Sequence, residues 1–218
     1  MVHNLTDAMQ DYLKEIHKLR MEGSRATTSA IAQRLGVRPP SVTAMLKRLT
    51  AGGLAEHTPY RGVELTPAGE RVALEVIRHH RLLEQYLTQA LGLSLDEVHS
   101  EADRLEHALS ETLEARIDQS LGFPTHDPHG DPIPDADLRI DRAQLRTLAS
   151  LEPGDQATIR RVPDGDEELL RYLAKLALVP GKKVRLRRAE PFGGPLTVRV
   201  GSAEHAISRE LAAGIGVA

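Results

Sequence analysis

Cysteine is absent from the 218 residues of this chain. Its absence excludes disulfides, thiolate metal ligands and a cysteine nucleophile, so any metal site must use histidine, carboxylate, amide, thioether or backbone donors. Long apolar runs are also absent: no segment approaches the roughly 18 consecutive apolar residues of a transmembrane helix. The N-terminal segment is amphipathic and lacks the apolar core of a signal peptide. Together these absences predict a cytoplasmic protein with no membrane partner.

Charge is unevenly distributed along a chain of ordinary globular composition, with 40% apolar and 27% charged residues. Residues 14–61 carry nine Lys and Arg against three Asp and Glu, whereas residues 62–141 carry six against seventeen. Residues 142–218 carry thirteen against nine. A basic segment suits phosphate binding and an acidic one suits divalent cations, although charge alone is equally consistent with solvated surfaces. The length accommodates one large or two to three small domains.

The basic first block has the spacing of a helix-turn-helix. Apolar residues at helical spacing predict a first helix over residues 6–20. A cap at Thr27 or Thr28 and a glycine stop at Gly36 bound a second helix. The Pro39–Pro40 pair then stands in the first turn of a third helix, where proline is tolerated.

The third predicted helix has one apolar face and one face of small, hydroxylated and basic side chains, which suit close approach to DNA. Two strand-like segments within residues 54–65 follow as a hairpin with an arginine at its tip, the shape of a wing. The block therefore predicts a winged helix-turn-helix that places a recognition helix in the major groove. A three-helix unit without a nucleic-acid role is the alternative. The predicted DNA contacts are Arg38, Pro40, Ser41, Thr43, Lys47, Arg48 and Arg61.

Histidine and carboxylate residues gather in the acidic middle block. His80 and Glu84 lie one turn apart on a long helix predicted over residues 67–90. A capping box at Ser94 starts a further helix, predicted over residues 95–109. Its predicted buried stripe consists of Val98, Ala102, Leu105 and Leu109. Another side carries candidate ligands, which are His99, Asp103, Glu106 and His107. An exposed helix face explains these four residues alone, but together with the pair on the preceding helix they predict a cation site, and its donors suit Mn(II) or Fe(II).

A loop rich in proline, glycine and aspartate separates this block from a β-rich end. The prolines of residues 122–141 hold the chain extended. For that reason no metal role is expected for its histidines and neighbouring aspartates, which are His126, Asp127, His129 and Asp131. Short alternating segments with glycine turns then predict a small barrel. The basic strand at residues 182–188 is expected to be a solvated face rather than a DNA contact.

The middle block contains the strings HHRLLEQYL, EVHSEADRLEHALSETLEARI and DPHGDPIP. Together with the upstream helix-turn-helix, these strings resemble the diphtheria toxin repressor and manganese transport regulator family, over nearly the whole chain. Members are dimeric transcriptional regulators that bind operator DNA when loaded with Fe(II) or Mn(II). The resemblance implies a mainly α fold with small β parts. Its expected domains are a winged helix-turn-helix (residues 1–66), a helical metal-binding and dimerisation domain with a linker (67–141), and an SH3-like, FeoA-like small β-barrel (142–218).

The resemblance implies a primary metal site made of Asp11, Asp103, Glu106 and His107. Asp11 stands where iron-type members have methionine and manganese-type members have aspartate. Asp103 stands where these subtypes have cysteine and glutamate, respectively. Both replacements exchange sulfur for hard oxygen, which favours Mn(II), with Fe(II) as the alternative cation. Without the resemblance, Asp11 is interpreted as an exposed carboxylate off the apolar stripe.

The resemblance also implies an ancillary site made of His80, Glu84 and His99. Iron-type members add oxygen ligands from the C-terminal domain, for which Asp166 and Glu167 are the candidates in this chain. Capping of the following helix is the alternative role of these two acids. Lys14 stands where manganese-type members often have a second carboxylate on the first helix, which argues against a tightly paired binuclear site.

These interpretations predict a homodimeric, Mn(II)-dependent DNA-binding regulator, a repressor of metal-uptake genes and not an enzyme. Asp11 comes from the DNA-binding domain and the other primary ligands from the dimerisation domain, so a shared cation would tie the two together and fix the spacing of the recognition helices. Alternatives are an Fe(II)-responsive regulator of iron homeostasis, a metalloenzyme whose cluster activates water, and a metal-independent winged-helix regulator. No nucleophile or oxyanion motif accompanies the cluster, which weighs against the enzyme.

Overall fold

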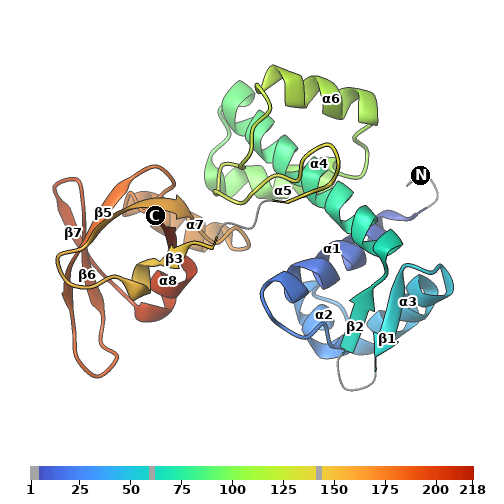
Figure 1. The fold of residues 1–218 in the computed structure, drawn as a ribbon, viewed down its shortest axis with the longest axis horizontal. Helices are drawn as coiled ribbons and strands as arrows, with labels where there is room; N and C mark the ends of the chain where they lie inside the picture. Colours follow the sequence, from blue (N-terminus) through green and yellow to red (C-terminus); the bar gives the residue numbers. More distant parts are fainter. Residues whose placement is uncertain (1–4, 59–61, 141–143) are drawn as a thin grey trace. The chain divides into compact units, whose positions relative to one another are not determined.

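The computed structural model describes residues 5–58, 62–140 and 144–218. Figure 1 shows the ribbon of the chain, coloured from blue at the N-terminus to red at the C-terminus. The chain divides into two compact units. The first unit comprises residues 1–80, 106–109 and 134–139, and the second comprises residues 81–105, 110–133 and 140–218. None of the helices in the described stretches is long and apolar enough to cross a membrane.

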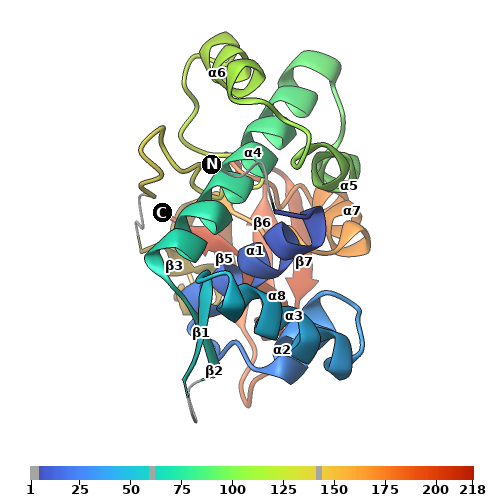
Figure 2. The same cartoon turned by 90° about the vertical axis from the view of Figure 1, so that its right-hand side faces the viewer.

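The first unit begins with three helices and a two-stranded hairpin (Figure 2), which are α1 (Asp7–Met21), α2 (Thr28–Arg34), α3 (Pro39–Ala51), β1 (Ala55–Thr58) and β2 (Gly62–Leu65). The strands pair antiparallel, with Ala55 opposite Leu65. The Thr6 hydroxyl caps α1 and the Thr27 hydroxyl caps α2, each accepting a hydrogen bond from a backbone N–H of the first helical turn. The predicted winged helix-turn-helix is confirmed.

Helix α3 turns its apolar stripe into the core of this unit. Val42 and Leu49 are completely buried and Leu46 is 9% exposed. They pack with apolar residues of the other two helices, chiefly Leu13, Ile16 and Ile31. Burial of this stripe fixes which side of α3 faces solvent.

Helix α4 (Pro67–Leu91) starts against the hairpin through a close backbone approach. A Cβ at Gly69 would lie 1.9 Å from the carbonyl oxygen of Leu54, so only glycine permits this packing. The N–H of Thr66 donates to the same carbonyl at 3.1 Å, and the Thr66 hydroxyl accepts a hydrogen bond from the N–H of Gly69. The first turn of α4 is thereby fixed to the hairpin. The helix contributes to both units, with the division after His80.

The next two helices are α5 (Leu95–Leu105) and α6 (Glu111–Ser120). One half of the predicted capping box of α5 is present, since the N–H and hydroxyl of Ser94 both donate to the Glu97 carboxylate, at 3.1 and 2.6 Å. The expected continuation of this helix to residue 109 is wrong, because α5 ends at Leu105 and a turn follows. Leu105, expected in the buried stripe, is 42% exposed, whereas Glu106 is 1% exposed. The chain leaves the helix at this point, and the Glu106 side chain is buried among polar partners.

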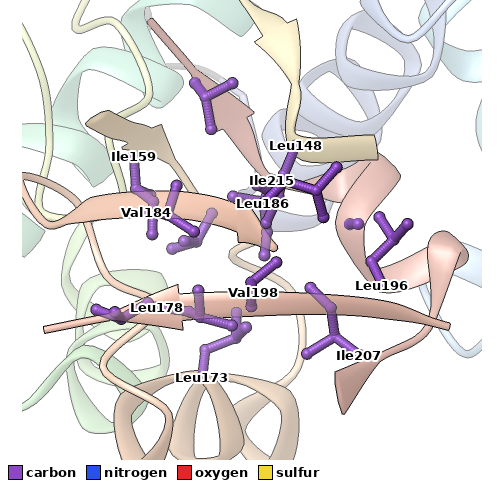
Figure 3. Close-up of a cluster of buried hydrophobic side chains, with 14 of the residues drawn as sticks. Leu148, Ile159, Leu173, Leu178, Val184, Leu186, Leu196, Val198, Ile207 and Ile215 are labelled. Carbon is purple, nitrogen blue, oxygen red and sulfur yellow. The ribbon is translucent and has the colours of Figure 1, made fainter. Parts of the chain in front are cut away.

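The C-terminal part of the second unit is a six-stranded antiparallel sheet in the order β3-β8-β4-β5-β6-β7. Its strands are β3 (Arg146–Thr147), β4 (Gln156–Arg161), β5 (Lys183–Ala189), β6 (Leu196–Val200), β7 (Ala203–Ile207) and β8 (Gly216–Val217). They are accompanied by η1 (Leu148–Ser150), α7 (Glu167–Lys175) and α8 (Arg209–Gly214). Leu186 and Val198 point toward each other from their strands, and Leu173 of α7 belongs to the same buried cluster (Figure 3). The predicted β-rich C-terminal domain is confirmed.

Candidate metal centres and DNA-binding face

One group of candidate ligands lies wholly within the first unit. Asp11 is on α1, and Glu106 and His107 occupy the turn after α5. Each offers one ligand atom, and the three atoms all lie within 4.8 Å of one another. His107 Nε2 is 2.9 Å from Asp11 Oδ1 and 3.5 Å from Glu106 Oε1. The structure therefore brings together three of the four residues predicted for the primary site.

Glu106 is the buried member of this group. Its Oε1 accepts a hydrogen bond from Lys14 Nζ at 2.6 Å, and its Oε2 lies 2.7 Å from His80 Nδ1. The ring of His79, the preceding residue on α4, faces the backbone carbonyl oxygen of Glu106 at 3.1 Å. Because an unpaired buried carboxylate is costly, these contacts stabilise the turn against both α1 and α4.

His107 is held between two oxygen acceptors. Its Nε2 lies 2.9 Å from Asp11 Oδ1, and its Nδ1 lies 2.9 Å from Gln10 Oε1. The hydrogen bond to Asp11 raises the pKa of His107 above its ordinary value, against the opposing effect of partial burial. A proton on Nε2 therefore competes with any cation that His107 would bind.

The predicted ancillary residues are distributed over the two units. Glu84 and His99 lie together in the second unit, with His99 Nδ1 3.0 Å from Glu84 Oε1. Asp103, the fourth residue predicted for the primary site, also belongs to the second unit, where its Oδ2 is 3.7 Å from His99 Nε2. His80 belongs to the first unit, where its ring contacts Glu106.

The second unit holds a further group of candidate ligands, formed by Glu84, Asp127 and His129. All three residues are buried, and His129 Nδ1 lies 3.6 Å from Glu84 Oε2. The other ring nitrogen of His129 faces the carbonyl oxygen of Leu95 at 3.1 Å, which leaves Nδ1 as the ligand atom. Within the described residues, His129 Nδ1 and Asp127 Oδ2 have no hydrogen-bond partner. Each has a charged neighbour at ion-pair distance: Arg81 Nε is 3.5 Å from Asp127 Oδ2, and Glu84 Oε2 is 3.6 Å from His129 Nδ1. Buried polar atoms without a hydrogen bond are rare in folded proteins, and a bound ion is one explanation for them.

The protonation of this group also indicates an excess of buried negative charge. Burial raises the pKa of Asp127 well above its ordinary value, and the neighbouring Glu84 charge raises it further. Burial by itself would lower the pKa of His129, but the Glu84 carboxylate outweighs that effect and raises the pKa to about 9. Protons are thus retained at atoms that a cation could bind.

No metal role was expected for Asp127 and His129, because the prolines of their loop hold the chain extended. In the structure the loop is held by the sheet: the Val162 N–H donates to the carbonyl oxygen of His129 at 2.9 Å. A Cβ at Gly130 would lie 1.7 Å from a backbone carbonyl oxygen of β4. Asp127 Oδ1 also closes a local turn by accepting the His129 N–H at 2.9 Å. The available signal was the Asp-x-His spacing, in which the aspartate can order its own turn.

The candidate ligands of the C-terminal domain have other contacts. Asp166 caps α7, where its Oδ1 accepts hydrogen bonds from the N–H groups of Glu168 and Leu169 at 2.9 and 3.1 Å. Glu167 lies 3.6 Å from the guanidinium of Arg171, one turn along the helix. In the part of the chain that the structure describes, neither acid joins a group of three candidate ligands.

A divalent cation fits both three-residue groups. Each group consists of carboxylate oxygens and imidazole nitrogen, a donor set suited to Mn(II) and Fe(II), and neither contains sulfur. In the second group, the buried atoms of Asp127 and His129 that lack a hydrogen bond give further support for a bound cation. Within a single unit, the residues that could hold a cation are Asp11, Glu106 and His107 in the first unit and Glu84, Asp127 and His129 in the second.

The polar face of α3 is exposed along its length. The exposed residues include all the predicted contacts on this segment, which are Arg38, Pro40, Ser41, Thr43, Lys47 and Arg48. The Thr43 hydroxyl donates to the Pro39 carbonyl oxygen at 3.2 Å. Arg48 also approaches the Met9 sulfur at 4.0 Å. Arg61, predicted at the tip of the wing, lies outside the described residues.

Family models match three successive parts of the chain. Residues 4–63 match the iron dependent repressor N-terminal DNA binding domain, and residues 66–135 match the iron dependent repressor metal binding and dimerisation domain. Residues 146–218 match the FeoA domain. The iron-dependent repressor IdeR of Mycobacterium tuberculosis is 33% identical over 228 residues, covering 99% of each chain. The chain belongs to the iron-dependent repressor family.

Solved structures of other repressors agree with this assignment. A manganese-dependent transcriptional repressor in complex with manganese has a TM-score of 0.88 and 38% sequence identity, covering 96% of this repressor and 98% of that chain. The manganese regulator SloR has a TM-score of 0.82 and 30% identity, covering 96% and 97%. The predicted family, fold class and general function are confirmed: this repressor is a metal-dependent DNA-binding regulator with a dimerisation domain and a β-rich FeoA domain. Its family comprises transcriptional repressors, not enzymes.

Proposed function

We propose that this repressor responds to Mn(II), with Fe(II) as the alternative cation, and represses metal-uptake genes as a cytoplasmic homodimer on operator DNA. The observation that carries the Mn(II) assignment is the group formed by Asp11, Glu106 and His107, whose donors are carboxylates and an imidazole. Hard oxygen donors suit Mn(II), whereas thiolate and thioether donors select softer cations. The relatives include repressors described as iron-dependent and as manganese-dependent, so their names do not decide between the two cations.

The proposal retains two sets of metal ligands. The primary set is Asp11, Asp103, Glu106 and His107, and the ancillary set is His80, Glu84 and His99. The geometry within the first unit supports three members of the primary set, and the pairing of Glu84 with His99 supports part of the ancillary set. To the ancillary set we add Asp127 and His129, because they converge on the same Glu84 carboxylate. Asp166 and Glu167 stay weaker candidates, since Asp166 already accepts the hydrogen bonds of a helix cap.

A bound divalent cation supplies the positive charge that clustered carboxylates lack. We propose that Asp11 engages the cation from the DNA-binding domain (residues 1–66), while Glu106 and His107 engage it from the dimerisation domain (67–141). Joint engagement of these side chains would restrict the movement of one domain against the other. Two half-sites of an operator, about one helical turn apart, can be bound together only if the recognition helices keep the matching separation. Metal and DNA then strengthen each other's binding.

We propose the same DNA-contacting residues that the sequence predicts, on the recognition helix and the wing. They are Arg38, Pro40, Ser41, Thr43, Lys47, Arg48 and Arg61. The exposure of the α3 residues among them supports this assignment, because the opposite side of the helix is buried. The FeoA domain (142–218) is the third domain proposed for the chain, after the DNA-binding domain (1–66) and the dimerisation domain (67–141).

The test is a titration of a labelled operator duplex, selected from random sequences in the presence of Mn(II). The duplex is titrated with protein under Mn(II), Fe(II), Zn(II) or chelator, and binding is followed by fluorescence anisotropy. We expect tight binding with Mn(II), and its loss with chelator or with the substitution His107→Ala. His126→Ala is the matched control, since His126 is exposed and lies in none of the groups of candidate ligands. Full Mn(II)-stimulated binding by His107→Ala would contradict the primary-site assignment.

A further inference from the structure

Lys14 is a buried cation in the first unit. Its side chain is only 8% exposed, and its Nζ lies 2.6 Å from Glu106 Oε1, an atom of a completely buried side chain. Lysine is rarely buried, because its ammonium group is strongly hydrated in water. A buried lysine therefore needs a charged partner, and here the partner is a proposed metal ligand.

The two carboxylate oxygens of Glu106 are both engaged. Lys14 Nζ binds Oε1, while His80 Nδ1 lies 2.7 Å from Oε2. Oε1 is also the oxygen that faces His107, with Nε2 at 3.5 Å. The ammonium group thus binds the same oxygen that faces the other candidate ligands. A divalent cation that used this oxygen would meet a positive charge within a few ångströms, in surroundings that screen charge poorly.

We propose that Lys14 is the resident counter-cation of this site, which a divalent cation must displace from Glu106 in order to bind. This inference rests on the proposed function, because it takes Glu106 to be a ligand. The lysine stem is long and flexible, so the ammonium group can leave the carboxylate by rotation of its own side chain. Lys14 stabilises Glu106 in the metal-free protein and lowers its affinity for metal. It thereby sets the cation concentration at which the repressor responds.

The first experiment measures Mn(II) affinity by isothermal titration calorimetry, on the full chain without DNA. The variants are Lys14→Met, which keeps an apolar stem of similar length, and the control Lys183→Met, which removes one exposed charge from β5. We expect Lys14→Met to bind Mn(II) at least about tenfold more tightly, because the cation no longer has to replace a buried ion pair. Lys183→Met should match the wild type. A residue that merely supported the site would give the opposite sign, so equal or weaker binding by Lys14→Met overturns the inference.

The second experiment uses the wild-type protein, and so decides the matter if Lys14→Met fails to fold. Lysines are acetylated briefly with an N-hydroxysuccinimide ester, with and without saturating Mn(II), and each site is quantified by mass spectrometry. We expect the labelling of Lys14 to rise severalfold with Mn(II), while the labelling of Lys183 stays constant. Unchanged or reduced labelling of Lys14 in the Mn(II)-loaded protein overturns the inference.

The two experiments also separate this inference from the proposed function. If the His107→Ala variant binds Mn(II) as tightly as the wild type does, the site assignment fails, and the role of Lys14 fails with it. If binding depends on His107 but Lys14→Met gives no gain in affinity, only the displacement of Lys14 is refuted.

Discussion

The substitution Gly130→Ala tests whether the sheet positions the ligand group of the second unit. Gly130 has a φ of +91°, and an added Cβ would lie 1.7 Å from a carbonyl oxygen of β4. The clash cannot be relieved by rotating a side chain, because the Cβ is attached rigidly to the backbone and the carbonyl oxygen is part of it. We therefore expect the loop to move away from β4, with loss of the hydrogen bond from the Val162 N–H to the His129 carbonyl oxygen.

Two costs add up in this variant. Alanine at positive φ costs about 1–2 kcal/mol, and the broken backbone hydrogen bond costs about 1 kcal/mol. Gly154→Ala is the matched control, since Gly154 has a φ of +102° but no atom within 4 Å of its Cβ position. It carries the backbone strain without the collision. The difference between the variants is then at least about 1 kcal/mol, or a melting temperature about 2–4 °C lower for Gly130→Ala than for Gly154→Ala.

Differential scanning calorimetry measures the stability, and calorimetric titration measures the number of Mn(II) ions bound. Displacement of the loop would separate Asp127 and His129 from Glu84, so Gly130→Ala should also bind one Mn(II) fewer at saturation. Equal melting temperatures and equal Mn(II) stoichiometry for the two alanine variants would show that the contact with β4 does not position these ligands.

Three further predictions concern pH, salt and DNA. The folded-state pKa values of Asp127 and His129 both lie above their ordinary values, so each contributes stability at low pH that is lost as pH rises through the folded-state pKa. Urea unfolding of the metal-free protein should therefore show stability falling from about pH 4, where unfolded Asp127 loses its proton, toward about pH 9, where folded His129 does. His129→Gln should flatten the part of that fall above neutral pH. The raised pKa of His107 means that protons compete with Mn(II) for its ring. The affinity for Mn(II) should therefore still increase with pH above the ordinary titration range of histidine. An affinity that does not change with pH there would contradict the assigned contact with Asp11. Lys47→Ala should weaken binding to all DNA sequences and reduce the slope of log affinity against log salt by about 1, as measured by anisotropy at several salt concentrations; an unchanged slope would remove Lys47 from the phosphate contacts.

The helices and the hairpin of the first unit were predictable because local signals determine them. Thr27 and Gly36 bound α2 as capping residues do, and the spacing of Val42, Leu46 and Leu49 fixed the buried side of α3. These signals lie within a few residues of the structure they specify. The same holds for the alternating strands of the C-terminal sheet.

The ligand groups were only partly predictable, because long-range contacts determine them. No glycine or proline marks the end of α5 at Leu105, and the turn that follows depends on Glu106 meeting Lys14, which is 92 residues away in the chain. Spacing along a continuous helix therefore could not place the residues after position 105. The grouping of Asp127 and His129 with Glu84 was not predicted for a similar reason, since the sheet holds their loop in a conformation that its prolines alone do not reveal.

The proline pair at the start of α3 limits the backbone hydrogen-bond donors that this end of the helix can offer. Pro39 and Pro40 carry no amide hydrogen, and the N–H groups of Ser41 and Val42 already donate to the Arg38 carbonyl oxygen. The tip of the helix therefore has no free backbone donor for a phosphodiester oxygen, unlike most helix starts. If α3 contacts DNA as proposed, its contacts with phosphates would come from long, charged side chains. The rigid proline rings would then set how closely the start of the helix can approach the DNA backbone.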